Sequence, residues 1–370
     1  MEASTPSRLE SNARLRSLDA LRGFDMLWIV GGGALLGAWA DSNEWAWLDS
    51  LRGQTEHAEW HGFTFWDLIF PLFLFLAGVS MPLSFAKRRE AGASSRSLAL
   101  FALRRGALLV ALGLVYNGAL AFQFDTLRCA SVLGRIGLAW MCAAWIWLGT
   151  SSMRARLAWV ATLLVGYWLA LTFVPVPGFG AGNLSPGATL TDWIDRQFLP
   201  GRLHRGVRDP EGLLSTLPAI ASALLGTFAG SELAHAGHEP RAKVVRLSAW
   251  ALACLTLGAL WALVFPLNKN LWTSSFALWC AGWSFALLAL FYLAFDVWKL
   301  RGALLFEVLG ANAIAIYLLR GFVDFDALAQ LALAGRGAAK LHPVLLAGGG
   351  LALEWLVLYA LYRARIFLRV

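Results

Sequence analysis

A short segment in the first third of the sequence holds the side chains best suited to acid–base chemistry. His57, Glu59, His61 and Asp67 lie just before or at the start of the apolar run LIFPLFLFLAGVS. A histidine with an ordinary pKa near ~6.5 can accept and return a proton at neutral pH, and a nearby carboxylate can fix its tautomer. The same composition is also typical of an interfacial belt at the lipid headgroups. The segment is therefore a candidate catalytic site with a structural alternative.

Other ionisable and amide side chains lie within or beside apolar runs, where such groups are costly and often functional. Asp19, Arg22 and Asp25 are spaced to share one side of a helix, which fits either a structural ion pair or part of a site. Arg135 and Arg320 fit either snorkelling or contact with an anion. The neutral amides suit either sugar hydroxyls or interhelical hydrogen bonds, and they are Asn268, Asn270 and Asn312.

The elements that must position these residues are predicted to be membrane-spanning helices. Hydrophobic residues make up 58% of the 370 residues and charged residues only 15%, against roughly 25% charged residues in a soluble domain. Apolar runs near the ~20 residues needed to cross a bilayer recur along the chain without the alternation of a β-barrel. We therefore expect a single all-α bundle of about ten spans. They fall near 20–40, 65–85, 104–122, 130–150, 156–175, 212–231, 246–266, 272–295, 303–320 and 343–362.

The distribution of charge predicts how these spans are oriented. The net charge of +8 comes mainly from Lys and Arg in short connectors, which indicates topology and not a nucleic-acid partner. The positive-inside rule favours cytoplasmic N- and C-termini, with 86–98 and 232–245 inside and the long connectors 41–64 and 176–211 outside. We expect a cytoplasmic segment 1–16 without a cleaved signal peptide, then one membrane domain over 17–370. Neither a metal site nor a disulfide frame is indicated, because the four cysteines show no CxxC spacing.

Several motifs in order resemble one known family, the heparan-α-glucosaminide N-acetyltransferase group of membrane acyltransferases. They are SLDALRG at 17–23, HAEWHGFTFWDLIFPLFLFLAG at 57–78, VLGRIGLAW at 132–140, DPEGLLSTLPAIASALLG at 209–226, NKNLW at 268–272 and GANAIAIY at 310–317. Bacterial relatives in this group have also been described as possible transporters related to N-acetylglucosamine. The resemblance extends from residue 17 past residue 317.

The resemblance implies a role for individual residues. The family histidine implicated in acetyl transfer from acetyl-CoA falls on His57, and the acid of the family's ADLVFP stretch falls on Asp67. The substrate-binding candidates are Trp60, His61, Asn268, Lys269, Asn270, Asn312 and Glu211. The chemistry of arginine, and not the resemblance, suggests the candidates for binding the acetyl-CoA donor, because arginine pairs well with phosphate but is also the ordinary residue of cytoplasmic connectors. They are Arg22, Arg104, Arg105 and Arg135.

Two positions depart from the family pattern. His61 replaces the asparagine of the family's WNG segment, and a family asparagine near the end of the first span is replaced within 31–33. An altered acceptor pocket, or a site that no longer catalyses transfer, would fit these changes. The GGG runs at 31–33 and 348–350 are interpreted as helix-packing points and not as phosphate loops, because no GK[ST] follows them.

The leading hypothesis is a multi-pass acetyltransferase of the bacterial inner membrane, with a homodimer as the candidate assembly. It would move an acetyl group from acetyl-CoA to the amino group of a hexosamine or glycan on the periplasmic side. His57 would act as acetyl acceptor or as general base, with Asp67 orienting it. The alternative is a transporter of N-acetylglucosamine or a related amino sugar. Composition alone does not separate His57 from His61, and only the motif favours His57.

Overall fold

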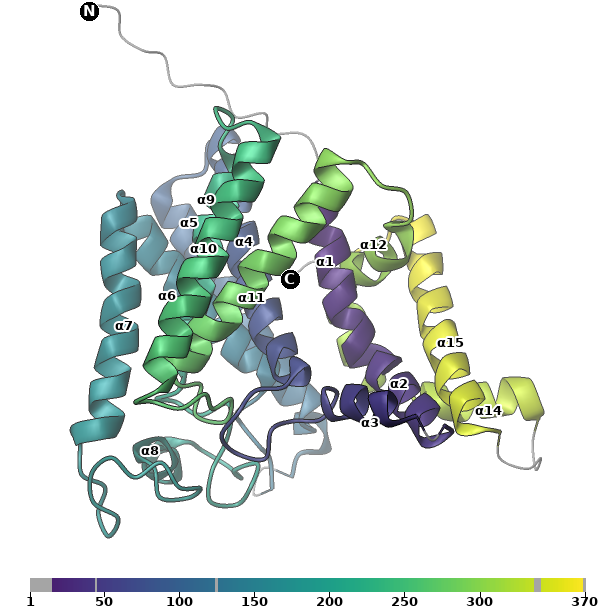
Figure 1. The fold of residues 1–370 in the computed structure, drawn as a ribbon, viewed down its shortest axis with the longest axis horizontal. Coiled ribbons are helices and arrows are strands. Elements are labelled where there is room, and N and C mark those ends of the chain that lie inside the picture. Colours follow the sequence, from purple (N-terminus) through teal and green to yellow (C-terminus); the bar gives the residue numbers. More distant parts are fainter. Residues whose placement is uncertain (1–14, 44, 124–125, 336–340, 369–370) are drawn as a thin grey trace, which may run out of the picture. The chain divides into compact units, whose positions relative to one another are not determined.

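The computed structural model of this protein describes residues 15–43, 45–123, 126–335 and 341–368. Within these ranges, helices are the regular secondary structure, accompanied by two isolated β-bridges (Figure 1). Nine of the described helices are long and apolar enough to cross a membrane. The predicted polytopic all-α fold is thus confirmed, although one of the ten predicted spans is broken. The predicted segment 1–16 lies, up to residue 14, outside the described residues.

The described chain forms two compact units, and the larger one comprises residues 59–63 and 70–289. Its helices are α4 (Phe65–Glu90, whose start belongs to the smaller unit), α5 (Ser95–Tyr116), η2 (Ala119–Ala121), α6 (Val132–Gly149), α7 (Met153–Phe173), α8 (Leu190–Phe198), α9 (Thr216–Ala234), α10 (Pro240–Ala262) and α11 (Ser274–Tyr292, whose end belongs to the smaller unit).

Serine caps determine where three of the long helices begin. The side chains of Ser94, Ser131 and Ser152 accept hydrogen bonds from the backbone at the starts of α5, α6 and α7. Such caps satisfy amides that have no partner within the helix. The span predicted at 104–122 accordingly begins at Ser95, because its cap precedes the charged first half of the helix.

Close contact between α4 and α9 organises the larger unit, and most of each helix is buried. Gly78 of α4 faces the backbone of Ala223, while Gly226 and Gly230 of α9 face the backbones of Phe75 and Val79. A side chain at any of these glycines would collide with main-chain atoms. The sequence GTFAG at 226–230 therefore acts as a small-xxx-small packing motif, which lets membrane helices approach closely.

The smaller unit comprises residues 15–58, 64–69 and 290–368. Its helices are α1 (Arg16–Leu27), η1 (Trp28–Gly32), α2 (Gly33–Asp41), α3 (Ala46–Gly53), η3 (Leu293–Val297), α12 (Leu304–Ala311), α13 (Ala313–Arg320), α14 (Phe325–Ala334) and α15 (Pro343–Arg363). α1 packs closely on α12, because Gly23 faces the backbone of Phe306 and Gly310 faces that of Asp19.

Two predicted spans are interrupted in this unit. The span at 20–40 passes through a π-helical turn, η1, in which Gly31 has φ 148°, a conformation that favours glycine. The span at 303–320 is broken at Asn312 into the short helices α12 and α13. Neither half of that second segment is long enough to cross a bilayer alone.

Short helices structure the two long connectors. The first connector contains α3, and the second contains α8, which starts with a capping box between Thr189 and Asp192. Both connectors were predicted from their length and polarity, but their internal helices were not.

Candidate functional site

His57 and Asp67 form a hydrogen-bonded pair in the smaller unit. The His57 Nδ1 atom lies 2.8 Å from Asp67 Oδ1. The Asp67 side chain is 1% exposed, whereas that of His57 is 51% exposed. The structure therefore joins the two residues to which the resemblance assigns catalysis, with the acid buried beneath a solvent-accessible imidazole.

The second oxygen of Asp67 is held by the loop that precedes α4. Asp67 Oδ2 accepts hydrogen bonds from the backbone amides of Thr64 and Ala58 at 3.2 Å and 3.3 Å, and it lies 3.1 Å from Thr64 Oγ1. Thr64 stands directly before α4, and Asp67 reaches back to its amide as the acid of a capping box does. A carboxylate in the first turn is also favoured by the helix dipole. The orientation of Asp67 is thus determined by local sequence.

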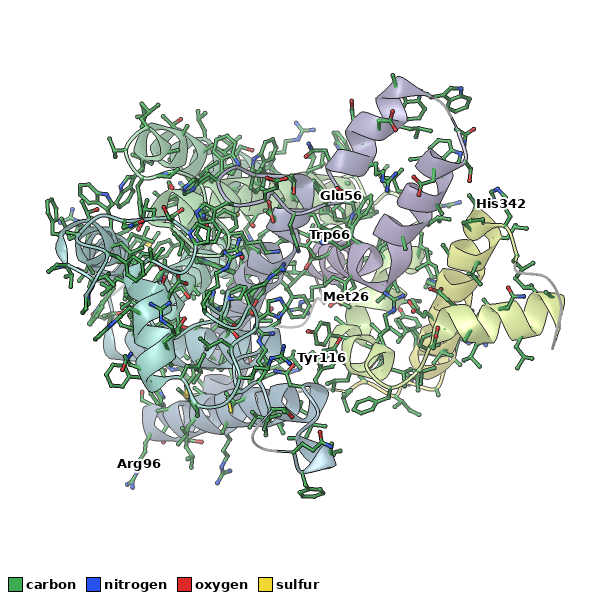
Figure 2. All side chains as sticks on the ribbon, turned by 90° about the horizontal axis from the view of Figure 1, so that it is seen from below. Met26, Glu56, Trp66, Arg96, Tyr116 and His342 are labelled. Carbon is green, nitrogen blue, oxygen red and sulfur yellow. The ribbon has the colours of Figure 1, made fainter. Side chains whose placement is uncertain are left out.

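The loop that carries His57 is closed by contacts between its two ends. Thr64 Oγ1 donates to the Glu56 carbonyl at 2.6 Å, and the amides of Phe65 and Trp66 bond the side chain and carbonyl of Gln54. The His57 and Trp66 rings lie 6.3 Å apart. Figure 2 labels Glu56 and Trp66, which stand near the two ends of this loop in the sequence.

This arrangement dictates the chemistry available to His57. An ionised carboxylate only accepts hydrogen bonds, so His57 Nδ1 must carry the proton in their contact. The Nε2 atom of a neutral imidazole then has the lone pair. His57 is consequently in the tautomer that a general base or nucleophile requires, with Asp67 able to stabilise the imidazolium that forms.

In the larger unit, His61 lies beside the NKNLW motif. Asn268 Nδ2 lies 3.3 Å from His61 Nδ1, and burial lowers the pKa of His61. Asn268 also organises its own turn, because its side chain accepts from the Leu271 amide and its backbone amide bonds Thr273 Oγ1. Sequence reasoning placed His61 and Asn268 in one candidate site, and the structure brings them together. Lys269 and Asn270 belong to the same turn.

Trp272 closes this turn in an unusual backbone conformation. Its φ is 49°, in the left-handed region that side chains rarely adopt, and its ring is buried. The indole donates to Ser222 Oγ at 3.2 Å, and the Arg135 guanidinium lies 5.3 Å from the ring centroid. Strain of this kind persists only where surrounding contacts enforce it, and it is common at functional sites.

Trp60 is held from two directions in the larger unit. Its indole donates to the Leu184 carbonyl at 2.8 Å, and the Arg208 guanidinium lies 4.3 Å from the ring centroid. The predicted substrate contact thus joins the first and second long connectors.

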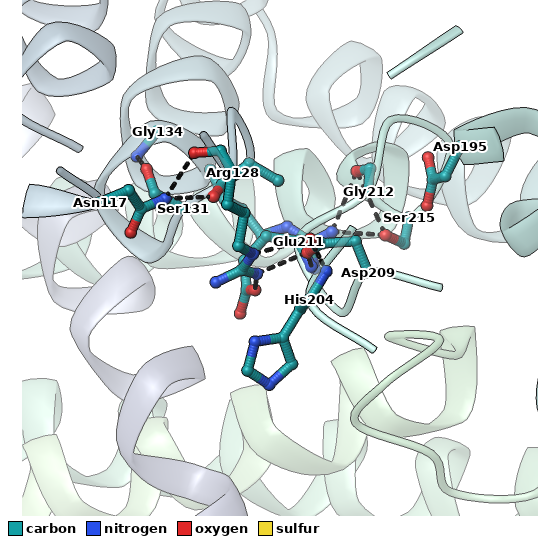
Figure 3. Close-up of polar contacts among 12 residues, drawn as sticks. Asn117, Arg128, Ser131, Gly134, Asp195, His204, Asp209, Glu211, Gly212 and Ser215 are labelled. Atoms are coloured by element: carbon teal, nitrogen blue, oxygen red, sulfur yellow. Dashed lines mark hydrogen bonds and ion pairs between the residues drawn. The ribbon is translucent and has the colours of Figure 1, made fainter. Parts of the chain in front are cut away.

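Glu211 belongs to an ion-pair cluster that the sequence did not reveal. Arg128 contacts Asp209 at 2.5 Å and 2.7 Å and also pairs with Glu211, and Asp209 accepts from the His204 amide at 3.0 Å (Figure 3). Burial alone would raise the pKa of Asp209, but its hydrogen bonds and ion pair with Arg128 outweigh that effect and lower it. Burial and the charge of Arg128 lower the pKa of His204. The acidic residues of the DPEG motif at 209–212 are the only sign of this cluster in the sequence, because their partner, Arg128, lies more than eighty positions earlier.

Arg135 lies deep in the larger unit, 2% exposed. It bonds the Gly212 carbonyl at 3.0 Å and Ser215 Oγ. The Gly212 backbone lies directly against the Asp195 carboxylate, which also accepts from the Leu213 amide at 2.8 Å (Figure 3). Burial raises the pKa of Asp195 to about 6. The bonds from Arg135 to Gly212 and Ser215 hold the segment that precedes α9. The sequence analysis did not select Asp195, because nothing in its sequence context indicates burial.

The remaining candidates are spread through the fold. Arg22 pairs with Asp19 at 3.4 Å, as their spacing predicted. Arg105 lies over the Trp140 ring at 4.1 Å, and Arg104 is exposed. Their binding of acetyl-CoA stays a prediction.

The Asn312 side chain is occupied by the C-terminal segment. It donates to the Ile366 carbonyl at 3.0 Å and accepts from the Leu368 amide at 2.9 Å. These bonds explain why an amide stands at the break between α12 and α13. Its proposed contact with substrate stays a prediction.

Comparison with known proteins supports the resemblance seen in the motifs. A family model described as a domain of unknown function (DUF5009) matches residues 14–190. Heparan-alpha-glucosaminide N-acetyltransferase from Mus musculus is 28% identical over 431 residues, covering 98% of this chain and 62% of the relative. The enzyme of that name from Homo sapiens is 29% identical over 420 residues, covering 96% and 60%. The chain spans about three fifths of the length of these relatives.

Proposed function

We propose that this chain, a multi-pass membrane protein similar to heparan-alpha-glucosaminide N-acetyltransferases over nearly its whole length, is itself an acetyltransferase that uses His57. The observation that carries the proposal is the His57–Asp67 pair, in which a buried carboxylate fixes an exposed imidazole. The pair occupies the positions at which the resemblance locates acetyl transfer. The acetyl donor would be acetyl-CoA, and the acceptor would be the amino group of a hexosamine or glycan.

Either of two reaction courses fits this pair. As a general base, Nε2 of His57 would take a proton from the acceptor amine. At the same time the nitrogen of the amine attacks the thioester carbonyl, and the C–S bond breaks. The imidazolium would then return the proton to the departing thiolate. As a nucleophile, Nε2 would attack the thioester carbonyl and take the acetyl group as the C–S bond breaks and the thiolate leaves. In a second step the amine would take the acetyl group from Nε2, and the proton that the amine loses would balance the proton taken up by the thiolate.

His61 has a different role in this proposal. Partial burial lowers its pKa, which favours the neutral imidazole, and its ring lies within hydrogen-bonding distance of Asn268. A neutral imidazole and an amide offer donors and acceptors suited to sugar hydroxyls. His61, Asn268 and Trp60 would therefore contact the acceptor, and His61 would account for a change of acceptor relative to family members with asparagine there.

The proposal is tested by following acetyl-CoA-dependent acetylation of glucosamine and related amino sugars by the purified protein in liposomes. His57→Ala should reduce turnover by at least ~10²-fold, because positioned acid–base catalysis contributes ~10²–10⁴-fold. Its melting temperature should stay close to that of the wild type, since the His57 side chain is half exposed. His61→Asn is the matched control and should retain turnover while changing the preference among acceptors. Full turnover by His57→Ala would refute the assignment.

A transporter of an amino sugar is the second candidate, and the broken helices of the smaller unit favour it. Interruptions at Gly31 and Asn312 resemble the discontinuous helices that form substrate sites in transporters. Uptake of radiolabelled N-acetylglucosamine by liposomes, with no acetylation of any amine, would establish this alternative over the enzyme. Residence in a bacterial inner membrane and assembly as a homodimer remain part of the proposal.

A further inference from the structure

Three exposed tryptophans form a cluster in the smaller unit, at the junction of α2 and α3. Trp39, Trp45 and Trp47 are 37%, 51% and 52% exposed. The rings of Trp45 and Trp47 are stacked with centroids 5.8 Å apart, and Trp39 meets Trp47 edge-on at 5.7 Å. We call these three residues the tryptophan cluster. So much aromatic surface in one exposed patch indicates a binding surface.

One residue anchors α3 to its own unit. Leu48 is fully buried, whereas Trp47 and Leu51, one turn apart, are exposed together. Arg52 pairs with Asp41 at the end of α2 and with Glu56 beside His57. α3 is thus an amphipathic helix that lies beside α2 (Figure 1), with Leu48 buried and the apolar side chains of Trp47 and Leu51 exposed next to it.

The position of the cluster along the chain identifies what covers that face. Trp39 lies in the last turn of the membrane span that ends at Asp41, and it contacts both other rings of the cluster. The cluster is therefore continuous with a lipid-facing span at the point where that span leaves the hydrocarbon. Tryptophan is enriched at this depth, because its ring is apolar and its N–H bonds the headgroup region.

We propose that α3 is an interfacial helix, which lies in the bilayer surface with the tryptophan cluster and Leu51 among the lipid headgroups. Amphipathic helices of this kind bind through their buried apolar area. The exposed polar residues of α3, such as Asp49, then face water.

The consequence concerns the loop that carries His57. Arg52 ties α3 to Glu56, and Gln54 at the end of α3 bonds the start of α4. The interfacial helix therefore fixes the depth of the His57 loop at the boundary between membrane and water. A polar acceptor can reach that depth without crossing hydrocarbon.

The test measures the membrane depth of α3 in the full-length protein in phosphatidylcholine nanodiscs. Spin labels are attached at Trp47→Cys, Leu51→Cys and, as the matched control on the opposite face, Asp49→Cys. The background carries C129S, C142S, C254A and C280A. Collision with oxygen should exceed collision with a water-soluble nickel chelate at positions 47 and 51, with a ratio several-fold higher than at 49. Equal ratios at all three positions would overturn the proposal.

Exclusion of both reagents at 47 and 51 would also overturn it, since protein and not lipid would then cover the face. A second measurement keeps the native cysteines, in case the substituted background does not fold. Brominated phosphatidylcholine should quench the fluorescence of the wild type more than that of the variant W39F/W45F/W47F. Identical quenching of the two proteins would contradict an interfacial position.

Discussion

Replacing Asp67 by asparagine should test whether the carboxylate determines the tautomer of His57. Asp67 Oδ1 accepts from His57, while Oδ2 accepts from the backbone amides of Thr64 and Ala58 and lies 3.1 Å from the Thr64 hydroxyl. An asparagine has one oxygen and one NH₂ group, so it can serve only one of these sides as an acceptor. The oxygen should stay with the two loop amides, which cannot pair with an NH₂ group, and this places the NH₂ group against His57 Nδ1.

This exchange should reverse the protonation of the imidazole. Facing a donor, His57 Nδ1 becomes an acceptor and the proton moves to Nε2, the atom that must accept a proton or an acetyl group. The base is then lost although the histidine remains. Since general-base catalysis contributes ~10²–10⁴-fold, turnover by Asp67→Asn should fall by ~10²-fold or more and approach that of His57→Ala.

The structural cost of the same substitution should be small. Asparagine keeps the shape of aspartate and the bonds to the loop, and the lost charge near the start of α4 is worth about 0.3–1 kcal/mol. Thr64→Val is the matched control, because it removes the hydrogen bond from the Thr64 hydroxyl to the Glu56 carbonyl and leaves the His57–Asp67 bond in place. It should reduce the free energy of unfolding by about 1 kcal/mol and turnover by less than ~10-fold.

The assay is acetyl transfer from acetyl-CoA to an amino sugar, with the melting temperature of each variant measured in the same detergent. Asp67→Asn should show a much lower turnover than Thr64→Val, while the two variants should have similar melting temperatures. The reasoning is wrong if Asp67→Asn keeps turnover within a few-fold of wild type, or if it loses turnover only in proportion to a loss of folded protein.

Three further predictions concern the stability of the larger unit. Burial raises the pKa of Asp195 from 3.8 to about 6, so between these pH values the folded protein holds a proton that the unfolded chain has lost. Stability should therefore fall by about 2 kcal/mol as pH rises from 4 to 7. Asp195→Asn should lose this pH dependence of stability. If the melting temperatures of the two proteins change with pH in the same way from pH 4 to 8, the prediction is wrong. Arg128→Ala should leave the buried Asp209 without its ion pair and reduce the free energy of unfolding by about 3 kcal/mol, measured as a lower melting temperature. The control Arg205→Ala changes an exposed residue and should have little effect. Equal effects of the two substitutions would contradict a stabilising role for the ion-pair cluster. Gly226→Ala should reduce the free energy of unfolding by about 1–3 kcal/mol, because the added methyl group would collide with the Phe75 backbone. Gly166→Ala is the control, since nothing lies near a methyl group at that position. Thermal melting should show a lower stability for Gly226→Ala only, and equal stability of the two variants would argue against close α4–α9 packing.

The sequence by itself determined the fold class and most of the spans, because both depend on local composition. Apolar runs of sufficient length must be helical in a bilayer, whatever their neighbours. The pairing of His57 with Asp67 was also accessible, since both residues lie in one motif and Thr64 fixes the start of α4 by a local cap.

Interruptions of helices were beyond a local reading. The segments that contain Gly31 and Asn312 are as apolar as unbroken spans, and hydropathy therefore predicts each as continuous. The break at Asn312 depends on the backbone of Ile366 and Leu368, more than fifty positions later. Only the folded chain supplies such partners.

The tertiary structure also decided which polar residues meet. Arg128 pairs with Asp209, and His61 lies beside Asn268, although long stretches of sequence separate the partners. Arg135 is buried against the segment that precedes α9. Charge and spacing in the sequence do not encode these contacts, because helix packing sets them through close approaches such as Gly78 against Ala223. Local pattern thus determined which segments are helices, and packing between distant segments determined which side chains they bring together.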